Sequence, residues 1–379
     1  MKILHVFNIP FSLPIFLGDQ IDYFNMLGSE VHIACSGSTK IHTFKKKWDF
    51  EYFELKIHRK FSFIEDLYSV YLLCKYIKKH KFKIVIGHTP KGAIIAMLSS
   101  FLCRVKKRIY FRHGLMFETS KGLKRKLLIL IEQLTSLLST EVVCVSHSVY
   151  YNSIKYKLSK KQQLLLIDRG SCNGIDSINR FNFDNCSVES IIIKKTIYNI
   201  CNCDIVIGFV GRLSRDKGIN ELVDAWSKVK DKNNNVKLFL CGPLDERDPI
   251  SDDTLLKIKH DSTIILSGEV EDTEYIFSLF SIFILPSFRE GLPTVVLEAS
   301  SMMLPVITTK STGCIDSIIE NETGIFCDID SESIYLNIQY YIDNPKIAKE
   351  HGINGRKFVR KYYNQKNIWA KLASLYLNK

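Results

Sequence analysis

Two glutamates lie eight residues apart in a stretch whose chemistry suits an anion. Glu290 and Glu298 flank the string Gly-Leu-Pro-Thr at residues 291–294. The apolar run 282–285 predicts a buried parallel strand, and residues 294–303 predict a helix. The free N–H groups and dipole of a helix start favour a phosphate, while carboxylates accept hydrogen bonds from hydroxyls. These features predict a sugar-nucleotide pocket; the alternative is an ordinary strand–turn–helix unit with two surface glutamates.

A second loop supplies cations. Residues 211–218, with the sequence Gly-Arg-Leu-Ser-Arg-Asp-Lys-Gly, follow a predicted strand at 205–209. Ligands bind beyond the carboxyl ends of strands in open α/β sheets, and Arg and Lys both bind phosphate oxygens. Arg212 and Lys217, together with the helix start at Thr294, would hold a diphosphate from two sides and neutralise its charge as it leaves. Taken alone, the segment also fits a solvated surface loop.

One histidine and one acidic string have both a functional and a structural interpretation. His113 follows a predicted strand at 108–111 and is placed to hydrogen-bond a sugar hydroxyl or phosphate oxygen, unless it is a structural histidine. Asp328 and Asp330 match the Asp-x-Asp string of many metal sites, but they immediately precede a predicted helix, so capping explains them better. The sequence contains no Cys/His metal cluster and no dinucleotide or ATP glycine string. We therefore predict neither a metal nor a cofactor.

Length and charge limit the classes of protein. The 379 residues are 46% hydrophobic and 24% charged, which suits two folded cores. Residues 1–179 hold 28 Lys and Arg against 13 Asp and Glu, which suggests an anionic partner, either a lipid leaflet or nucleic acid. An ordinary basic surface is the alternative. Eleven scattered cysteines indicate reduced thiols and a cytoplasmic location.

Two apolar helical runs, 93–105 and 127–138, bear on membrane attachment. Both are shorter than the roughly 20 residues that a membrane-spanning helix needs. Any attachment is therefore expected to be peripheral.

Strand and helix signals alternate along the whole chain, which predicts an α/β fold with parallel sheets. An irregular run at 178–204 separates two such series. We predict an N-terminal domain at residues 1–180, a linker region at 181–203, a C-terminal domain at 204–362 and a final helix at 363–379. No internal repeat of 20–50 residues is apparent.

Together these motifs resemble the family 4 glycosyltransferases. Glu290 and Glu298 resemble the paired-glutamate motif of that family, and the loop from Gly211 to Gly218 resembles its diphosphate loop. Further strings occur in the order expected for its N-terminal half: His88-Thr89-Pro90, His113-Gly114, Ser146-His147-Ser148 and Asn173-Gly174-Ile175-Asp176. The resemblance covers nearly the whole chain. The chain is similar to the members that build bacterial capsule, O-antigen or other surface glycans.

The resemblance implies a GT-B fold, in which two Rossmann-like domains face each other across a cleft. The C-terminal domain would bind a nucleoside diphosphate sugar, the N-terminal domain would bind the acceptor, and the last helix would cross back to the N-terminal domain. The family retains anomeric configuration and typically needs no metal. The nucleotide-sugar-binding residues that it implies are Gly211, Arg212, Lys217, Val270, Gly291, Leu292, Pro293, Thr294 and Glu298.

The resemblance also implies catalytic and acceptor-side residues. Glu290 and His113 would contact the transferred sugar. Gly18 and Arg112 are placed on the acceptor side. The turn around Gly18 departs from the family pattern, because it has one glycine where members often have several.

The function predicted from these features is a retaining transfer of a hexosyl or N-acetylhexosaminyl group. The donor is expected to be a UDP-sugar, and the acceptor a hydroxyl of a growing glycan carried on a polyprenyl diphosphate. That lipid would place the basic half at the inner face of the plasma membrane. The alternatives are a nucleotide-sugar epimerase or phosphorylase on the same fold, a two-carboxylate hydrolase, or a non-catalytic sugar-binding protein. Nucleic acid is not expected as a partner.

Overall fold

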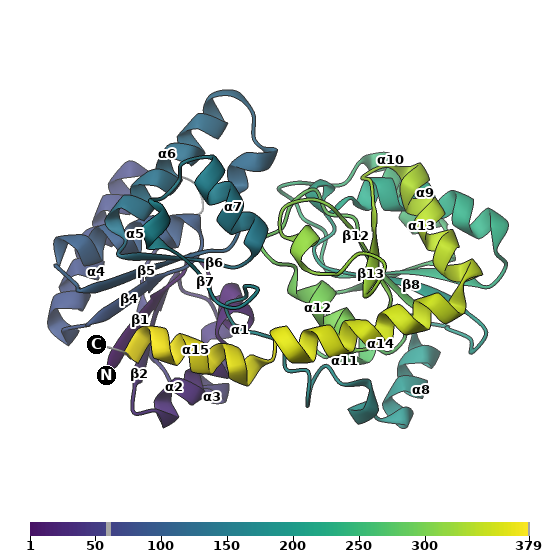
Figure 1. The fold of residues 1–379 in the computed structure, drawn as a ribbon, viewed down its shortest axis with the longest axis horizontal. Helices are drawn as coiled ribbons and strands as arrows, with labels where there is room; N and C mark the ends of the chain where they lie inside the picture. The colour runs from purple at the N-terminus through teal and green to yellow at the C-terminus, as the bar shows by residue number, and fades with distance from the viewer. Residues whose placement is uncertain (58–61, 378–379) are drawn as a thin grey trace. The chain divides into compact units, whose positions relative to one another are not determined.

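The chain divides into two units, each built on its own parallel sheet. The computed structural model describes residues 1–57 and 62–377. Unit 1 comprises residues 1–174 and 365–379, and unit 2 comprises residues 175–364. Each unit contains a parallel sheet with helices on both of its faces (Figure 1). This confirms the predicted α/β class.

The sheet of unit 1 has seven parallel strands in the order β3-β2-β1-β4-β5-β6-β7. Its strands are β1 (Lys2–Val6), β2 (Glu30–Cys35), β3 (Glu51–Glu54), β4 (Ile84–Gly87), β5 (Lys107–Arg112), β6 (Glu141–Cys144) and β7 (Leu164–Leu166). Its helices are η1 (Pro10–Ser12), α1 (Leu13–Phe16), α2 (Gln20–Met26), α3 (Lys40–Lys47), α4 (Phe63–His80), α5 (Pro90–Leu102), η2 (Met116–Thr119), α6 (Gly122–Leu138), α7 (His147–Lys155), η3 (Lys161–Gln163) and α15 (Gln365–Leu377). The strand order reverses between β1 and β4, which is where such sheets open a ligand crevice.

Helices α4, α5 and α6 cover one face of this sheet, and α2 and α15 cover the other (Figure 1). Central strand β4 is buried along its whole length, as its continuous apolar run requires. Helix α5 lies between α4 and α6 and is itself mostly buried. Helices α4 and α6 therefore present much of the outer surface on this side of the sheet.

The sheet of unit 2 has six parallel strands in the order β10-β9-β8-β11-β12-β13. Its strands are β8 (Ile205–Val210), β9 (Val236–Cys241), β10 (Ile264–Gly268), β11 (Ile282–Leu285), β12 (Val306–Thr309) and β13 (Gly324–Cys327). Its helices are η4 (Phe183–Asn185), α8 (Val188–Ile197), η5 (Arg215–Lys217), α9 (Ile219–Lys232), α10 (Asp252–His260), α11 (Thr273–Phe277), α12 (Thr294–Ser301), η6 (Cys314–Asp316), α13 (Ser331–Asp343) and α14 (Pro345–Tyr362). Here the strand order reverses between β8 and β11.

The run 181–203, expected to be a linker region, contains η4 and α8. Helix α8 is capped by the Ser187 hydroxyl and packs against α11 inside unit 2. Three successive isoleucines at 191–193 obscure its period, because β-branched residues follow one another around the helix. The chain leaves unit 1 at Gly174 and returns to it at Gln365.

Candidate active site

The two loops singled out in the sequence follow the two strands at which the order of unit 2 reverses. Residues 211–218 leave β8, and residues 286–293 leave β11. Gly218 has φ +72°, and a Cβ there would clash with the Pro286 carbonyl. A glycine is therefore needed for the loops to approach this closely, and they do so where open α/β sheets bind ligands.

Asp216 ties the two loops together. Its carbonyl oxygen accepts hydrogen bonds from the Phe288 N–H at 2.9 Å and from the Ser287 hydroxyl at 3.0 Å. Its carboxylate accepts from the Ser214 hydroxyl at 2.6 Å and pairs with Arg289 at 3.4 Å. Burial alone would raise the pKa of Asp216, but the Ser214 hydrogen bond and nearby cations bring it below its usual value. Asp216 was not among the predicted site residues, although its position between two basic residues was a signal.

Lys217 and Glu290, which lie 73 positions apart in sequence, form a salt bridge between the two loops. Each side chain is only 15% exposed. The Glu290 N–H donates to the Thr312 carbonyl at 2.8 Å, so the loop after β12 holds this segment from its other side. A diphosphate arriving here would compete with Glu290 for the ammonium group.

Helix α12 begins at Thr294, where the sequence predicted its start, and Pro293 is its N-cap. In the described structure no side chain caps this helix, and its first turn has no acidic residue. Its first N–H groups can therefore serve a ligand, and the helix dipole favours an anion there. Gly291 is buried and Leu292 half-buried beside this helix start.

Glu298 lies half-buried on α12, one turn after Thr294, whose hydroxyl hydrogen-bonds its carboxyl group. Burial raises the pKa of Glu298 to about 7, and the positive charge of Arg180 acts in the opposite direction. Arg180 itself donates to Glu274 at 2.9 Å and to the Glu271 carbonyl at 2.8 Å. Once it is ionised, this carboxyl group, one turn into α12, can accept hydrogen bonds from two neutral hydroxyls.

The other predicted donor residues lie in loops along the same sheet edge. Arg212 pairs with Asp245 in the loop after β9 and is half exposed, so in this structure its guanidinium is engaged by a carboxylate other than Glu290. Gly211 has φ +150° at the end of β8. Val270 is half-buried just after β10 and packs against the core of unit 2. The structure thus brings Lys217, Glu290 and the α12 start together, whereas Arg212 is paired elsewhere.

The acidic string before α13 caps that helix. The Asp330 carboxylate accepts a hydrogen bond from the Ser333 N–H at 2.8 Å, which confirms the capping interpretation. Among residues 1–57 and 62–377, no group of three His, Cys, Asp or Glu is arranged to hold a metal ion.

In unit 1, His113 ends a chain of three histidines. His5 Nδ1 lies 3.0 Å from His88 Nε2, and His88 Nδ1 lies 2.9 Å from His113 Nε2. Burial lowers the pKa of His5 and of His113 to about 3, and that of His88 well below its usual value. All three rings are therefore neutral at pH 7, with one N–H each, so the tautomer of His113 is coupled to those of the other two.

Aromatic rings enclose this histidine chain. Phe16 stacks on His113 with ring centroids 3.7 Å apart, and Phe7 stacks on His88 at 4.5 Å. Phe16 comes from the loop after β1, which folds into η1 and α1 in place of a glycine-rich turn. Gly18, at φ +50°, makes the turn that follows. Phe16 was not among the predicted site residues, and its place in the loop after the first strand was the available signal.

Thr89 adds backbone strain beside these histidines. It has φ +61°, an unusual value for a β-branched residue, and its hydroxyl donates to the Asn8 side-chain oxygen at 2.8 Å. It follows β4, where the strand order of unit 1 reverses. Strain of this kind concentrates at functional sites, which favours this edge as the ligand edge of unit 1.

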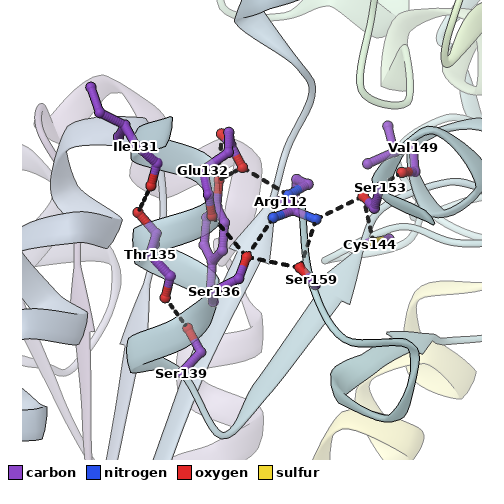
Figure 2. A network of polar contacts seen from close by, with 11 residues as sticks. Arg112, Ile131, Glu132, Thr135, Ser136, Ser139, Cys144, Val149, Ser153 and Ser159 are labelled. Carbon is purple, nitrogen blue, oxygen red and sulfur yellow. Dashed lines mark hydrogen bonds and ion pairs between the residues drawn. The ribbon is translucent and has the colours of Figure 1, made fainter. Parts of the chain in front are cut away.

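Arg112, expected on the acceptor side, has no exposed surface. Its Nε donates to Glu132 at 2.8 Å, and its other nitrogens donate to Ser153, Ser159 and Ser136 (Figure 2). Arg112 is the last residue of β5, and its side chain lies on the face of the sheet that α6 covers. Arg112 therefore holds α6 in place and does not reach an acceptor.

Two family models match the chain. One, described as glycosyl transferases group 1, matches residues 193–358, and the other, described as glycosyl transferase 4-like, matches residues 5–166. The chain is 31% identical to the capsular polysaccharide biosynthesis glycosyltransferase CapM of Staphylococcus aureus, over 99% of this chain and 96% of CapM. It is 23% identical to the UDP-Gal:alpha-D-GlcNAc-diphosphoundecaprenol alpha-1,3-galactosyltransferase of Escherichia coli, over 100% and 97% of the two chains.

Solved structures show the same fold. The chain superposes on Anabaena HepE in complex with UDP and glucose with a TM-score of 0.83, covering 100% of both chains at 16% identity. A glycosyltransferase from Rickettsia africae gives a TM-score of 0.80, covering 99% of this chain and 97% of the other at 21% identity. These likenesses confirm the GT-B fold class.

Proposed function

This chain belongs to the family 4 glycosyltransferases, and from that premise we propose that it transfers a sugar from a nucleoside diphosphate sugar to a hydroxyl of a bacterial surface glycan. The observation that carries the proposal is the Lys217–Glu290 pair beside the uncapped start of α12. A cation and free helix N–H groups at one strand reversal suit a diphosphate, because both stabilise its negative charge.

We assign the donor to the carboxyl edge of unit 2. Lys217 and the α12 N–H groups would hold the diphosphate, and Glu298 would accept hydrogen bonds from the ribose hydroxyls. Arg212, which is half exposed, would exchange Asp245 for a phosphate. Val270 and its neighbours would meet the base through backbone atoms. We propose UDP as the nucleotide, in keeping with HepE, whose solved complex contains UDP and glucose.

The proposed reaction retains the anomeric configuration and needs no metal. The bond from the anomeric carbon to the diphosphate oxygen breaks, and the acceptor oxygen bonds to that carbon from the same face. The departing diphosphate oxygen takes the acceptor proton, so the protein needs no strong nucleophile. Glu290 would contact the transferred sugar, while Lys217 would leave its carboxylate to neutralise the diphosphate. His113, in unit 1, would hydrogen-bond a substrate hydroxyl.

We propose a capsular or related surface glycan as the acceptor, carried on a polyprenyl diphosphate. CapM is named for capsular polysaccharide biosynthesis, and the Escherichia coli relative is named for a diphosphoundecaprenol-linked acceptor. The acceptor is assigned to the carboxyl edge of unit 1, where the rings are neutral and stacked. Of these rings, Phe16 and His113 are only half-buried, and such neutral rings suit sugar rings and hydroxyls better than free anions.

A panel of UDP- and GDP-sugars tests the proposal by thermal shift and by turnover with a lipid-linked glycan acceptor. A donor that binds should raise the melting temperature, and Glu298→Ala and Lys217→Ala should abolish that rise. Unchanged turnover in both variants would overturn the donor assignment. Turnover of the nucleotide sugar alone would indicate an epimerase, turnover with free phosphate a phosphorylase, and binding without turnover a sugar-binding protein.

A further inference from the structure

Helix α6 turns polar side chains toward the sheet, flanked by half-buried Leu128 and Ile129, which pack against the core of unit 1. Its buried side chains are Glu132, Thr135 and Ser136, and Glu132 is paired with buried Arg112 (Figure 2). The Tyr110 hydroxyl also donates to Glu132 at 3.0 Å. This network fixes the rotation of the helix, because turning it would leave a buried arginine and glutamate without partners. The face opposite the network must then point away from the sheet.

Five leucines form that outward face. Their spacing of four, three, four and three residues places them within one stripe of a helix with 3.6 residues per turn. The exposed fractions are 83% for Leu123, 50% for Leu127, 49% for Leu130, 44% for Leu134 and 67% for Leu137. We call these residues the leucine stripe. A water-soluble helix normally buries such a stripe, so its exposure indicates a surface that something else covers.

Lysines border the leucine stripe. At about 100° per residue, Lys124 and Lys126 project on its two sides. Around α6, residues 121–161 hold eight Lys and Arg against two acids, and of those acids Glu132 is buried and Glu141 half-buried. The Gln133 side chain donates a hydrogen bond to the Lys157 carbonyl, so the lysine-rich segment 155–161 lies against the same helix. The exposed charges around the stripe are thus positive.

A second apolar strip lies on α4, which flanks α5 on the same face of the sheet (Figure 1). Phe63, Ile64, Leu67, Tyr68 and Tyr71 are between 49% and 82% exposed in its first half. Both helices start near the carboxyl edge of the sheet, because each returns antiparallel to the strands. Neither these nor any other helix in the described residues is long and apolar enough to cross a membrane.

We propose that the leucine stripe of α6 and its bordering lysines dock unit 1 on an anionic lipid bilayer. The leucines enter the acyl boundary, and the lysines meet the headgroups. A second copy of this chain is the poorer occupant, because pairing two copies of this face would bring lysine against lysine. The proposal deepens the proposed function by placing the carboxyl edge of unit 1 near a lipid-linked acceptor, but it stands on the surface alone and is tested separately.

The test is cosedimentation of the full chain with vesicles of phosphatidylcholine alone or mixed with phosphatidylglycerol. The unmodified protein should bind the anionic vesicles at least about tenfold more tightly than the neutral ones, and added salt should weaken this binding. Leu127→Gln/Leu130→Gln/Leu134→Gln should lower the affinity at least about tenfold while keeping good helix formers. Lys124→Gln/Lys126→Gln should cost about fivefold per lysine on anionic vesicles only.

Matched controls come from unit 2. Leu244, Leu256 and Leu336 are 47% to 55% exposed, so their triple change to Gln removes similar apolar surface. Lys346→Gln/Lys349→Gln removes two exposed lysines. Neither control should change vesicle binding.

Equal binding to both vesicle types, or an unaffected leucine-stripe variant, would overturn the proposal, as would a dimer that the stripe variant abolishes in sedimentation. The UDP-induced melting shift should persist in every variant; its absence in the unmodified protein would contradict the proposed function alone.

Discussion

The carboxyl edges of the two sheets carry opposite chemistry, although both units have the same doubly wound design. In unit 2 the edge holds charges in pairs, namely Lys217 with Glu290 and Arg212 with Asp245. In unit 1 the edge holds neutral, stacked rings, including three histidines whose pKa values burial has lowered. The fold supplies a ligand edge in each unit, and the side chains decide what that edge can bind.

Two arginines show how far position alone can mislead. Arg112 ends β5 and Arg212 follows β8, so both were placed at ligand edges. Arg112 is fully buried beside Glu132, whereas Arg212 is 51% exposed on its side chain. The first stabilises the core of its unit, and the second is free to turn toward an anion.

The largest effect is expected at the charged carboxyl edge of unit 2. Lys217→Ala should lower turnover at least about 100-fold, because it removes the cation that neutralises the departing diphosphate. Initial rates with a nucleotide sugar and acceptor measure this. Lys230→Ala is the control, since Lys230 is also a half-buried lysine paired with a carboxylate, Asp261 at 2.7 Å. An equal loss in both variants would show that general destabilisation caused it.

A second test compares the roles of the two arginines by making the same substitution at each. Arg112→Met should lower the free energy of unfolding by about 3–5 kcal/mol, because it leaves Glu132 buried without its ion-pair partner. Arg212→Met should leave unfolding nearly unchanged and weaken UDP binding. Urea denaturation and calorimetric titration separate the two outcomes. Arg112→Met with unchanged stability would mean that the buried network does not hold α6.

A third test uses the pKa of Glu298, which burial raises to about 7. The ionised form accepts from ribose hydroxyls, so affinity for a UDP-sugar, whose phosphates do not titrate near pH 7, should fall as the pH drops through about 7. In Glu298→Gln that pH dependence should vanish, and affinity above pH 7 should fall about 10- to 100-fold. Titration calorimetry at several pH values measures both; a persistent pH dependence in the variant would assign it to another group.

The same substitution should stabilise the protein. A carboxyl pKa that is higher in the folded chain than in the unfolded chain means that stability is lost as the pH rises from about 4.5 to about 7, and it stays lost above pH 7. Removing the ionisable group should therefore raise the free energy of unfolding at pH 8 by about 1–3 kcal/mol. At pH 4 the two proteins should unfold alike, and a stabilisation that is independent of pH would contradict this origin.

The smallest effect is expected at the neutral carboxyl edge of unit 1. His88→Phe keeps the stacked ring but breaks both links of the histidine chain, so the tautomer of His113 is no longer fixed. We expect kcat to fall about tenfold with little change in nucleotide KM. His351→Phe, which removes another buried histidine, bonded to Tyr341 at 2.8 Å in unit 2, is the control. A change in nucleotide KM alone would contradict a role in positioning His113.

Much of the donor edge was predictable because its parts are close in sequence. The strand, turn and helix around Glu290, Thr294 and Glu298 occupy one short stretch, and local geometry places them together. The loop at residues 211–218 was found by its glycines and cations. That Lys217 pairs with Glu290 was not predictable, because it depends on β8 and β11 lying side by side.

The sequence by itself determined the α/β class, the two strand–loop–helix motifs of unit 2 and the leucine period of α6, since each is written in the spacing of neighbouring residues. Only the tertiary structure decided which groups meet. It joined His5, His88 and His113 from three strands or their ends, and it paired Arg112 with Glu132. A buried charge must find its partner, and that requirement turned the leucines of α6 outward where hydrophobic spacing alone would have buried them.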